Sequence, residues 1–301
     1  MKTWTDPEIG DIRALLGAMG TAPLPTEIDY PARRAGMDAY GDMSPPPEGT
    51  TVAALHLGGR PAERLSPPGA ALDRALLYFH GGAYSLGSPR SHRGLAGQLA
   101  GAAGALAFVP DYRLAPEHPC PAAVDDGLAA YRDLLDQGFA PEKILLCGDS
   151  AGGGLALATA LGARQAGLGQ PAGLLLISPW VSMTPSEPSV SEMDGQDPMM
   201  SAAGVRLSAA HYLGGRADDA ISSPLRADLS GLAPLFIQVG SEELLRSDAT
   251  ALAERAREAG LTVQLEIWPE MIHVWHAFYP MLGAARRAIA EAGGWMQGRL
   301  T

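Results

Sequence analysis

A single serine, Ser150, stands in the segment ILLCGDSAGGG (144–154) with a glycine two residues away on either side. The apolar run before it is typical of a strand, and the Ala- and Leu-rich run after it is typical of a helix. A G-x-S-x-G sequence between a strand and a helix predicts a sharp turn that presents the serine hydroxyl above a sheet edge. Larger flanking side chains would collide in such a turn. Ser150 is therefore the candidate nucleophile.

A serine hydroxyl is a poor nucleophile at neutral pH and needs a general base. Around a serine turn of this type the chain order is serine, acid, histidine. Three histidines follow Ser150, and His211 lies in a predicted helix of an insertion. His276 falls at the start of another helix, where we expect a packed or solvated ring. His273 follows the last predicted strand, on a loop that can reach over the sheet edge, and is the predicted base.

The acid is expected after the strand LFIQVG (235–240), in a segment that offers Glu242, Glu243 and Asp248. Asp248 is eight residues past the strand and fits a helix cap or first-turn position. The two glutamates lie where the strand ends, which is where loops of such sheets carry function. Adjacent residues leaving a strand point to opposite sides, so one of them can face the histidine. The residues alone leave both open.

A further motif, HGGAYSLGS (80–88), follows another predicted strand. Glycine-rich loops of this kind let backbone N–H groups approach a developing oxyanion. A serine, a histidine, an acid and such a loop together predict acyl transfer. No zinc-ligand spacing such as H-E-x-x-H accompanies them, and we expect neither a metal nor a cofactor.

These motifs sit on an alternating pattern of apolar and helical segments. Strands are predicted at 51–57, 75–80, 105–110, 143–148, 172–178, 234–240 and 261–268, and helices at 91–103, 121–137, 151–165, 247–259 and 282–298. The alternation predicts an α/β protein with a mostly parallel sheet covered on both faces. Two segments depart from it. Residues 1–45 are predicted to be an N-terminal cap segment, and about 180–222 a cap insertion in the catalytic domain 46–301.

Composition narrows the class of partner. The chain has 301 residues and a net charge of −11, from 33 acidic and 22 basic residues. This balance argues against nucleic acid or an anionic membrane as a stable partner, because both need concentrated Lys and Arg. Two cysteines make no disulfide framework. The N-terminus has no secretory h-region, so a cytoplasmic location is expected.

Four motifs occur in an order that resembles the hormone-sensitive lipase family, and more narrowly its bacterial esterase branch. They are HGGAYSLGS (80–88), DYRLAPEHPCPAAVDD (111–126), GDSAGG (148–153) and the histidine loop near 273. The resemblance spans roughly residues 78–276. It implies the α/β-hydrolase fold with a helical cap and carboxylesterase activity.

The resemblance also implies roles for matching residues. Ser150 would be the nucleophile and His273 the base; Gly82, Ala83 and Ala151 would give the oxyanion-hole N–H groups, and Gly81 would shape that loop. Two positions depart from the commoner family pattern. Ala83 replaces a third glycine, and the acid position carries glutamate instead of aspartate. The family places the acid about 30 residues before the histidine, which selects Glu243 over Glu242.

The predicted reaction is hydrolysis of a small-molecule ester with a short to medium acyl group, because no long hydrophobic lid helix is evident. An amide or lactone hydrolase with the same triad, and a non-catalytic small-molecule binding protein, are the alternatives. Six residues could line the pocket, although packing in the core or on the surface is the favoured interpretation for each: Met37, Met43, Trp180, Met183, Met199 and Met200. The last strand should be a sheet edge. That edge leaves two outcomes: a homodimer, which the resemblance favours, or a monomer whose edge is protected by charges.

Overall fold

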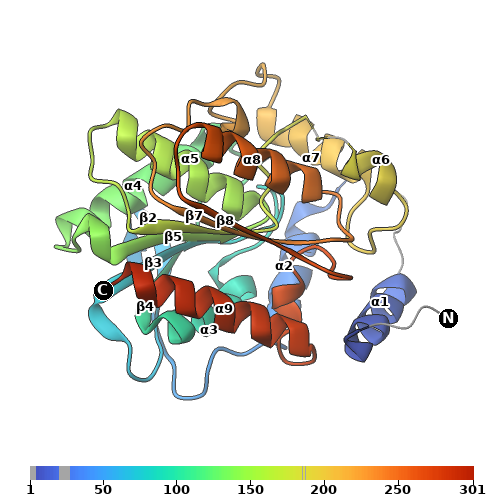
Figure 1. Ribbon diagram of the computed structural model, residues 1–301, viewed down its shortest axis with the longest axis horizontal. Helices are drawn as coiled ribbons and strands as arrows, with labels where there is room; N and C mark the ends of the chain where they lie inside the picture. The colour runs from blue at the N-terminus through green and yellow to red at the C-terminus, as the bar shows by residue number, and fades with distance from the viewer. Residues whose placement is uncertain (1–4, 20–27, 185, 187) are drawn as a thin grey trace.

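The computed structural model describes residues 5–19, 28–184, 186 and 188–301. Its strands form one eight-stranded sheet in the order β1-β2-β4-β3-β5-β6-β7-β8 (Figure 1). They are β1 (Thr51–Leu57), β2 (Arg60–Ser66), β3 (Ala71–Phe79), β4 (Ala105–Pro110), β5 (Ile144–Asp149), β6 (Gly173–Ile177), β7 (Leu235–Gly240) and β8 (Val263–Trp268). Neighbouring strands in the part of the sheet that runs β4-β3-β5-β6-β7-β8 are parallel, whereas β2 is antiparallel to both of its neighbours. The predicted α/β sheet is confirmed.

The sequence analysis missed one strand, β2, and placed the start of β3 four residues late. The segment RPAERLS of β2 carries a proline and three charged residues, and it does not alternate strictly. It is a strand because Gly58 and Gly59, at φ +58° and +78°, turn the chain back onto β1. Central strands are easier to recognise. Strands β4 to β7 are buried along their whole length, so their sequences are nearly unbroken apolar runs.

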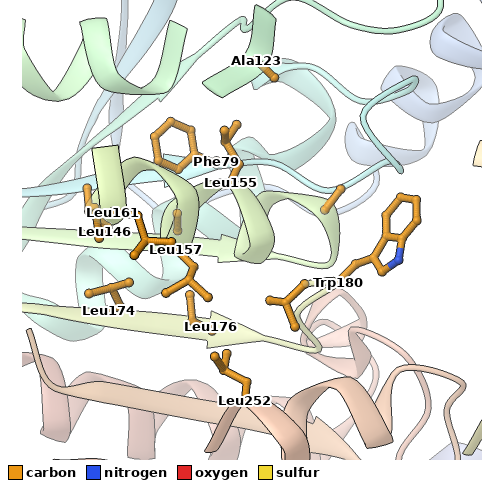
Figure 2. Close-up of a cluster of buried hydrophobic side chains, with 14 of the residues drawn as sticks. Phe79, Ala123, Leu146, Leu155, Leu157, Leu161, Leu174, Leu176, Trp180 and Leu252 are labelled. Carbon is orange, nitrogen blue, oxygen red and sulfur yellow. The ribbon is translucent and has the colours of Figure 1, made fainter. Parts of the chain in front are cut away.

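Helices cover both faces of the sheet, as Figure 1 shows. One face carries α3 (Pro89–Ala103) and α9 (Gly283–Arg299), and the other carries α4 (Ala122–Asp136), α5 (Ala151–Gln165) and α8 (Arg246–Glu258). Each face has its own buried apolar cluster. Figure 2 shows the cluster on the α5 side, where leucines of α5 meet leucines of the sheet. Within the described residues, no helix has the length and apolarity needed to cross a membrane.

The two segments predicted to form a cap both include helices where they are described. They contain α1 (Pro7–Met19), α2 (Tyr30–Gly41), α6 (Ser189–Met193) and α7 (Ala202–Leu213). In Figure 1, α1, α2 and α6 lie toward the same end of the sheet. A buried carboxylate anchors the start of the insertion: Asp248 accepts the N–H groups of Val181, Ser182 and Ser186. Asp248 is in the first turn of α8, as expected, but its side chain holds a loop instead of serving only its own helix.

Helix α1 is fastened to the loops that follow the last two strands. Its Ile9 and Ile12 are fully buried, in the same apolar cluster as Met271 and Ile272. Arg13 forms an ion pair with Glu242 at 3.2 Å. Helix α1 therefore packs against the segments that carry the candidate acid, Glu243, and the candidate base, His273.

This packing yields a prediction about α1. Replacing Ile9 and Ile12 together by Ala should release the helix, because truncating a buried isoleucine typically costs about 2–5 kcal/mol. Limited trypsin digestion should then cut after Arg13 much faster than in the wild type. Leu15→Ala is the control, since Leu15 is 48% exposed. Equal cleavage rates in the double variant and the control would show that α1 is not held by these two residues.

Candidate active site

Ser150 occupies a strained turn between β5 and α5. Its backbone has φ +54° and ψ −121°, a region that non-glycine residues rarely adopt. The turn is so tight that a Cβ on Gly148 would lie 2.3 Å from the carbonyl oxygen of Gly152. The Ser150 N–H donates to the carbonyl of Ile177 at 2.8 Å, which fixes the turn against β6. The flanking glycines of the motif are therefore a steric requirement.

The same turn also positions the HGG loop. A Cβ on Gly152 would lie 2.0 Å from the carbonyl oxygen of Phe79, at the end of β3. The start of α5 thus touches the point where the chain leaves β3 for the loop. Ala151 is the first residue of α5, where backbone N–H groups have no partner within the helix.

Loop residues Gly81 to Ala83 are held in a shape that only small residues allow. The Gly81 N–H donates to a carboxylate oxygen of Asp149 at 3.0 Å, so this N–H is already used and Gly81 shapes the loop. Gly82 has φ +112°, and a Cβ there would lie 2.3 Å from the carbonyl oxygen of Leu86. Ala83 follows at φ +55°. Both residues line the same two cavities as Ser150.

His273 is paired with Glu243. The distance from His273 Nδ1 to Glu243 Oε1 is 3.2 Å, and the glutamate is fully buried. The other carboxylate oxygen, Oε2, accepts the N–H of Gly240 at 2.9 Å and the hydroxyl of Ser178 at 2.8 Å. Ser178 Oγ also accepts the N–H of Val274 at 3.1 Å. One serine hydroxyl therefore ties the glutamate to the histidine loop.

Sequence reasoning missed Ser178 because a serine just after a buried strand carries no distinctive pattern. Its one unusual feature, φ +45°, is visible only in the structure. His92 was set aside as a base because it precedes Ser150 in the chain. It lies on α3, and its Nε2 is 3.5 Å from Asp149 Oδ2, beside the serine turn.

The structure separates the candidate acids. Glu242 turns toward α1 and pairs with Arg13, and Asp248 holds the start of the insertion. Of the three candidates, Glu243 is the one that reaches His273. Glu242 and Glu243 are adjacent in the chain, but their side chains thus point to opposite sides of the loop.

The two histidines of the last loop differ in their electrostatics. Burial alone would lower the pKa of His273, but its hydrogen bond to Glu243 and the nearby negative charges outweigh burial and raise the pKa. His276 is fully buried, with Nε2 2.9 Å from Gln238 Oε1. Its burial lowers the pKa to about 3. A neutral, packed ring at His276 agrees with the expectation from the sequence.

Two cavities meet at Ser150, and Gly82, Ala83, Met199 and Met200 border both. The first has a volume of about 300 Å³, includes His273, and is mostly apolar, with walls that include Met37, Leu95, Val274 and Phe278. The second, about 440 Å³, extends toward α7 and includes Tyr30, Ser85, Trp180 and Ser208. Most predicted lining residues therefore reach a cavity. The other two fit the packing interpretation: Met183 is buried in the core, and Met43 is 66% exposed.

Comparisons with known proteins bear on the fold, the family and the class of enzyme. The model of a family described as having the alpha/beta hydrolase fold matches residues 76–277. An acetyl-hydrolase of Streptomyces hygroscopicus is 45% identical over 262 residues, which cover 86% of each chain. The crystal structure of an esterase from the bacterial hormone-sensitive lipase family superposes with a TM-score of 0.94 at 39% identity, covering 100% of both chains.

The chain belongs to the bacterial hormone-sensitive lipase family. The family resemblance and the α/β-hydrolase fold inferred from the sequence are confirmed, and the protein is a carboxylic ester hydrolase. The structure of another esterase, EstE5, soaked with p-nitrophenyl butyrate, has a TM-score of 0.93 at 42% identity and covers 98% of this chain and 99% of that one.

The pairing in this hydrolase predicts distinct histidine titrations. In NMR spectra, His273 should titrate above the ordinary histidine pKa of about 6.5, and Glu243→Gln should lower its pKa because a negative hydrogen-bond acceptor is lost. Glu242→Gln is the matched control and should leave it unchanged. His276 should stay neutral down to about pH 5. A larger effect from Glu242→Gln would reassign the partner of His273.

Proposed function

We propose that the protein hydrolyses carboxylic esters through Ser150 as nucleophile, His273 as general base and Glu243 as the orienting acid. The observation that carries the proposal is the buried His273–Glu243 pair, at 3.2 Å, whose histidine borders the same cavity as the strained serine. A fully buried carboxylate that accepts a hydrogen bond from an imidazole fixes the tautomer in which the other ring nitrogen can accept a proton.

The proposed reaction has two acyl-transfer steps. Ser150 Oγ forms a bond to the ester carbonyl carbon while its proton passes to His273 Nε2. The C–O bond to the alcohol then breaks, and His273 gives the same proton to the leaving oxygen. Water attacks the acyl-enzyme with His273 again as base, and the carboxylic acid leaves with Ser150 restored. Glu243 stays ionised and stabilises the imidazolium in both steps.

Negative charge develops on the carbonyl oxygen in each tetrahedral intermediate. We assign its stabilisation to the backbone N–H groups of Gly82, Ala83 and Ala151. In support, the Gly81 N–H is bound to Asp149 and anchors the loop, and Gly82 and Ala83 line the same cavities as Ser150. Preorganised donors of this kind need no rearrangement as charge forms, and each is worth about 10²–10³ in kcat.

The two cavities suggest how an ester is oriented. His273 must reach the leaving oxygen, so the alcohol is assigned to the first cavity, which contains that ring. The acyl group is assigned to the second, and its volume of about 440 Å³ suits short to medium chains. Residues 1–45 and about 180–222 are proposed to form the cap. Members of both segments border these cavities, among them Met37 and Met200.

Amide or lactone hydrolysis by the same triad is the second candidate. The name of the Streptomyces relative specifies an acetyl group and not the atom that carries it. Rates on p-nitrophenyl acetate, p-nitrophenyl butyrate, p-nitroacetanilide and a short lactone would separate the two. A protein that binds these compounds and turns over none of them would support the binding-only alternative.

Other inferences from the sequence stay predictions. Strand β8 is an edge of the sheet, as expected, and the exposed Ile267 on it offers an apolar contact. A homodimer through this edge is a proposal whose test is the mass in solution. Three further inferences also stay predictions: a cytoplasmic location, a small-molecule ester as partner, and the lack of nucleic-acid, stable membrane or cofactor binding.

Removing the nucleophile or the base should abolish turnover. Ser150→Ala and His273→Ala should each lower kcat on p-nitrophenyl butyrate by up to about 10⁶, because the two groups act as a unit. His276→Ala is the control: it should lower stability, since Gln238 Oε1 loses its hydrogen bond to His276 in the core, and alter kcat far less. Folded Ser150→Ala protein with more than about one percent of wild-type activity would contradict the assignment.

Loss of Glu243 should reduce kcat less than loss of His273 but more than loss of Glu242. Glu243→Gln should lower kcat by about 10⁴, because the histidine loses its orienting charge while serine and base remain. Glu242→Gln should be near wild type, since that side chain faces α1. Steady-state kinetics of the purified pair decide the matter. A slow Glu242→Gln enzyme beside an active Glu243→Gln enzyme would reverse the choice of acid.

A further inference from the structure

Asp197 is a buried carboxylate of the insertion that the proposed reaction does not use. It is 3% exposed and accepts three backbone N–H groups. Its Oδ1 receives the N–H of Met199 at 2.8 Å and that of Met200 at 3.1 Å. Its Oδ2 receives the N–H of Leu244 at 3.0 Å. The two oxygens of one side chain therefore hold the neighbouring turn and also Leu244, which lies 47 residues further along the chain from Asp197.

Both of these segments contribute directly to the candidate active site. Met199 and Met200 border both cavities, so the turn that carries them is a wall of the substrate site. Leu244 directly follows Glu243, the residue paired with His273. A shift of either segment would pull on the same carboxylate.

We propose that Asp197 is a positioning residue that locks the Met199–Met200 wall to the catalytic-acid loop. The pocket shape and the Glu243–His273 alignment are thereby set together. This inference rests on the proposed function of that pair. Asp197 does not touch the reacting atoms, and it acts through Leu244 on one side and the two methionines on the other.

The chemistry of the link requires a carboxylate. Both of its oxygens accept, whereas an asparagine would turn an NH₂ group toward one set of backbone N–H donors. Burial raises the pKa of Asp197, and the N–H groups that it accepts offset part of that cost by replacing the hydration of the charge. Asp194 gives a useful contrast. It is exposed, its carboxylate accepts the N–H of Ala202 at 2.8 Å, and that bond stays within the insertion.

The negative charge of Asp197 also acts on His273. It is one of the charges that raise the pKa of that ring, after Glu243 and before Asp149. His273 and Glu243 are in turn the ionisable groups that influence Asp197. Loss of the charge should therefore lower the pKa of His273.

The experiment compares Asp197→Asn with Asp194→Asn in the full-length protein. We measure kcat and KM on p-nitrophenyl acetate and p-nitrophenyl hexanoate, and the His273 pKa by NMR. For Asp197→Asn we expect kcat on the acetate to fall about tenfold to a hundredfold, as expected for a misaligned site. We also expect an altered hexanoate-to-acetate ratio of kcat/KM and a lower His273 pKa. Asp194→Asn should leave all three quantities near wild type.

Several outcomes would overturn the proposal. A folded Asp197→Asn protein with unchanged kcat, acyl-length ratio and His273 pKa would do so, and so would equal effects from Asp194→Asn. A changed ratio with unchanged kcat would show that Asp197 shapes the wall without reaching the acid loop. If Asp197→Asn does not fold, Asp197→Ser, which keeps one acceptor and no charge, is measured by the same criteria. A wild-type protein without esterase activity would refute the proposed function, and the NMR comparison would still test the Asp197 charge.

Discussion

The backbone turn at Ser150 is the constraint on which the rest of the site depends. A non-glycine residue in this conformation costs on the order of 1–3 kcal/mol, so the surrounding structure must enforce it. Hydrogen bonds do so on both sides: the Ser150 N–H donates to Ile177, and the Ser150 carbonyl accepts the N–H of Trp180 at 2.9 Å. Gly148 and Gly152 allow the close backbone contacts that remain. The turn thus connects β5 to the ends of β3 and β6 at one point.

A second common feature, near the carboxyl ends of the strands, is a set of buried carboxylates. Asp149, Asp197, Glu243 and Asp248 are all nearly or fully buried, and each accepts backbone N–H groups from a loop. An ionised group removed from water is expensive unless hydrogen bonds replace its hydration. Each carboxylate is therefore stable only when its loop is in place, and each loop is held by its carboxylate. In this way, hydrogen bonds to buried carboxylates hold several long loops in one defined site.

The sequence predicted the site best where chemistry restricts local backbone geometry. Ser150 could be recognised because its flanking glycines are a steric requirement, and the central strands because burial on both faces makes them continuously apolar. Strand β2 could not be recognised, since its pairing comes from a hairpin and its face is partly solvated. Glu243 was separated from Glu242 by a family spacing alone, because the direction of a side chain on a loop depends on distant partners such as Arg13. No local pattern marks Ser178, whose partners Glu243 and Val274 are distant in the chain. Asp197 accepts the neighbouring N–H groups of Met199 and Met200, but its link to Leu244 is a tertiary contact that the local sequence does not indicate.

The central claim is that Ser150 is activated by His273 to attack a carbonyl carbon. Stoichiometric labelling with diethyl p-nitrophenyl phosphate tests it most directly, because this reagent transfers a phosphoryl group to an activated serine and releases one coloured nitrophenolate. We predict release of about one equivalent per chain, with peptide mass spectrometry placing the adduct on Ser150, and no burst in His273→Ala. Labelling of a different serine, or an undiminished burst without His273, would contradict the account.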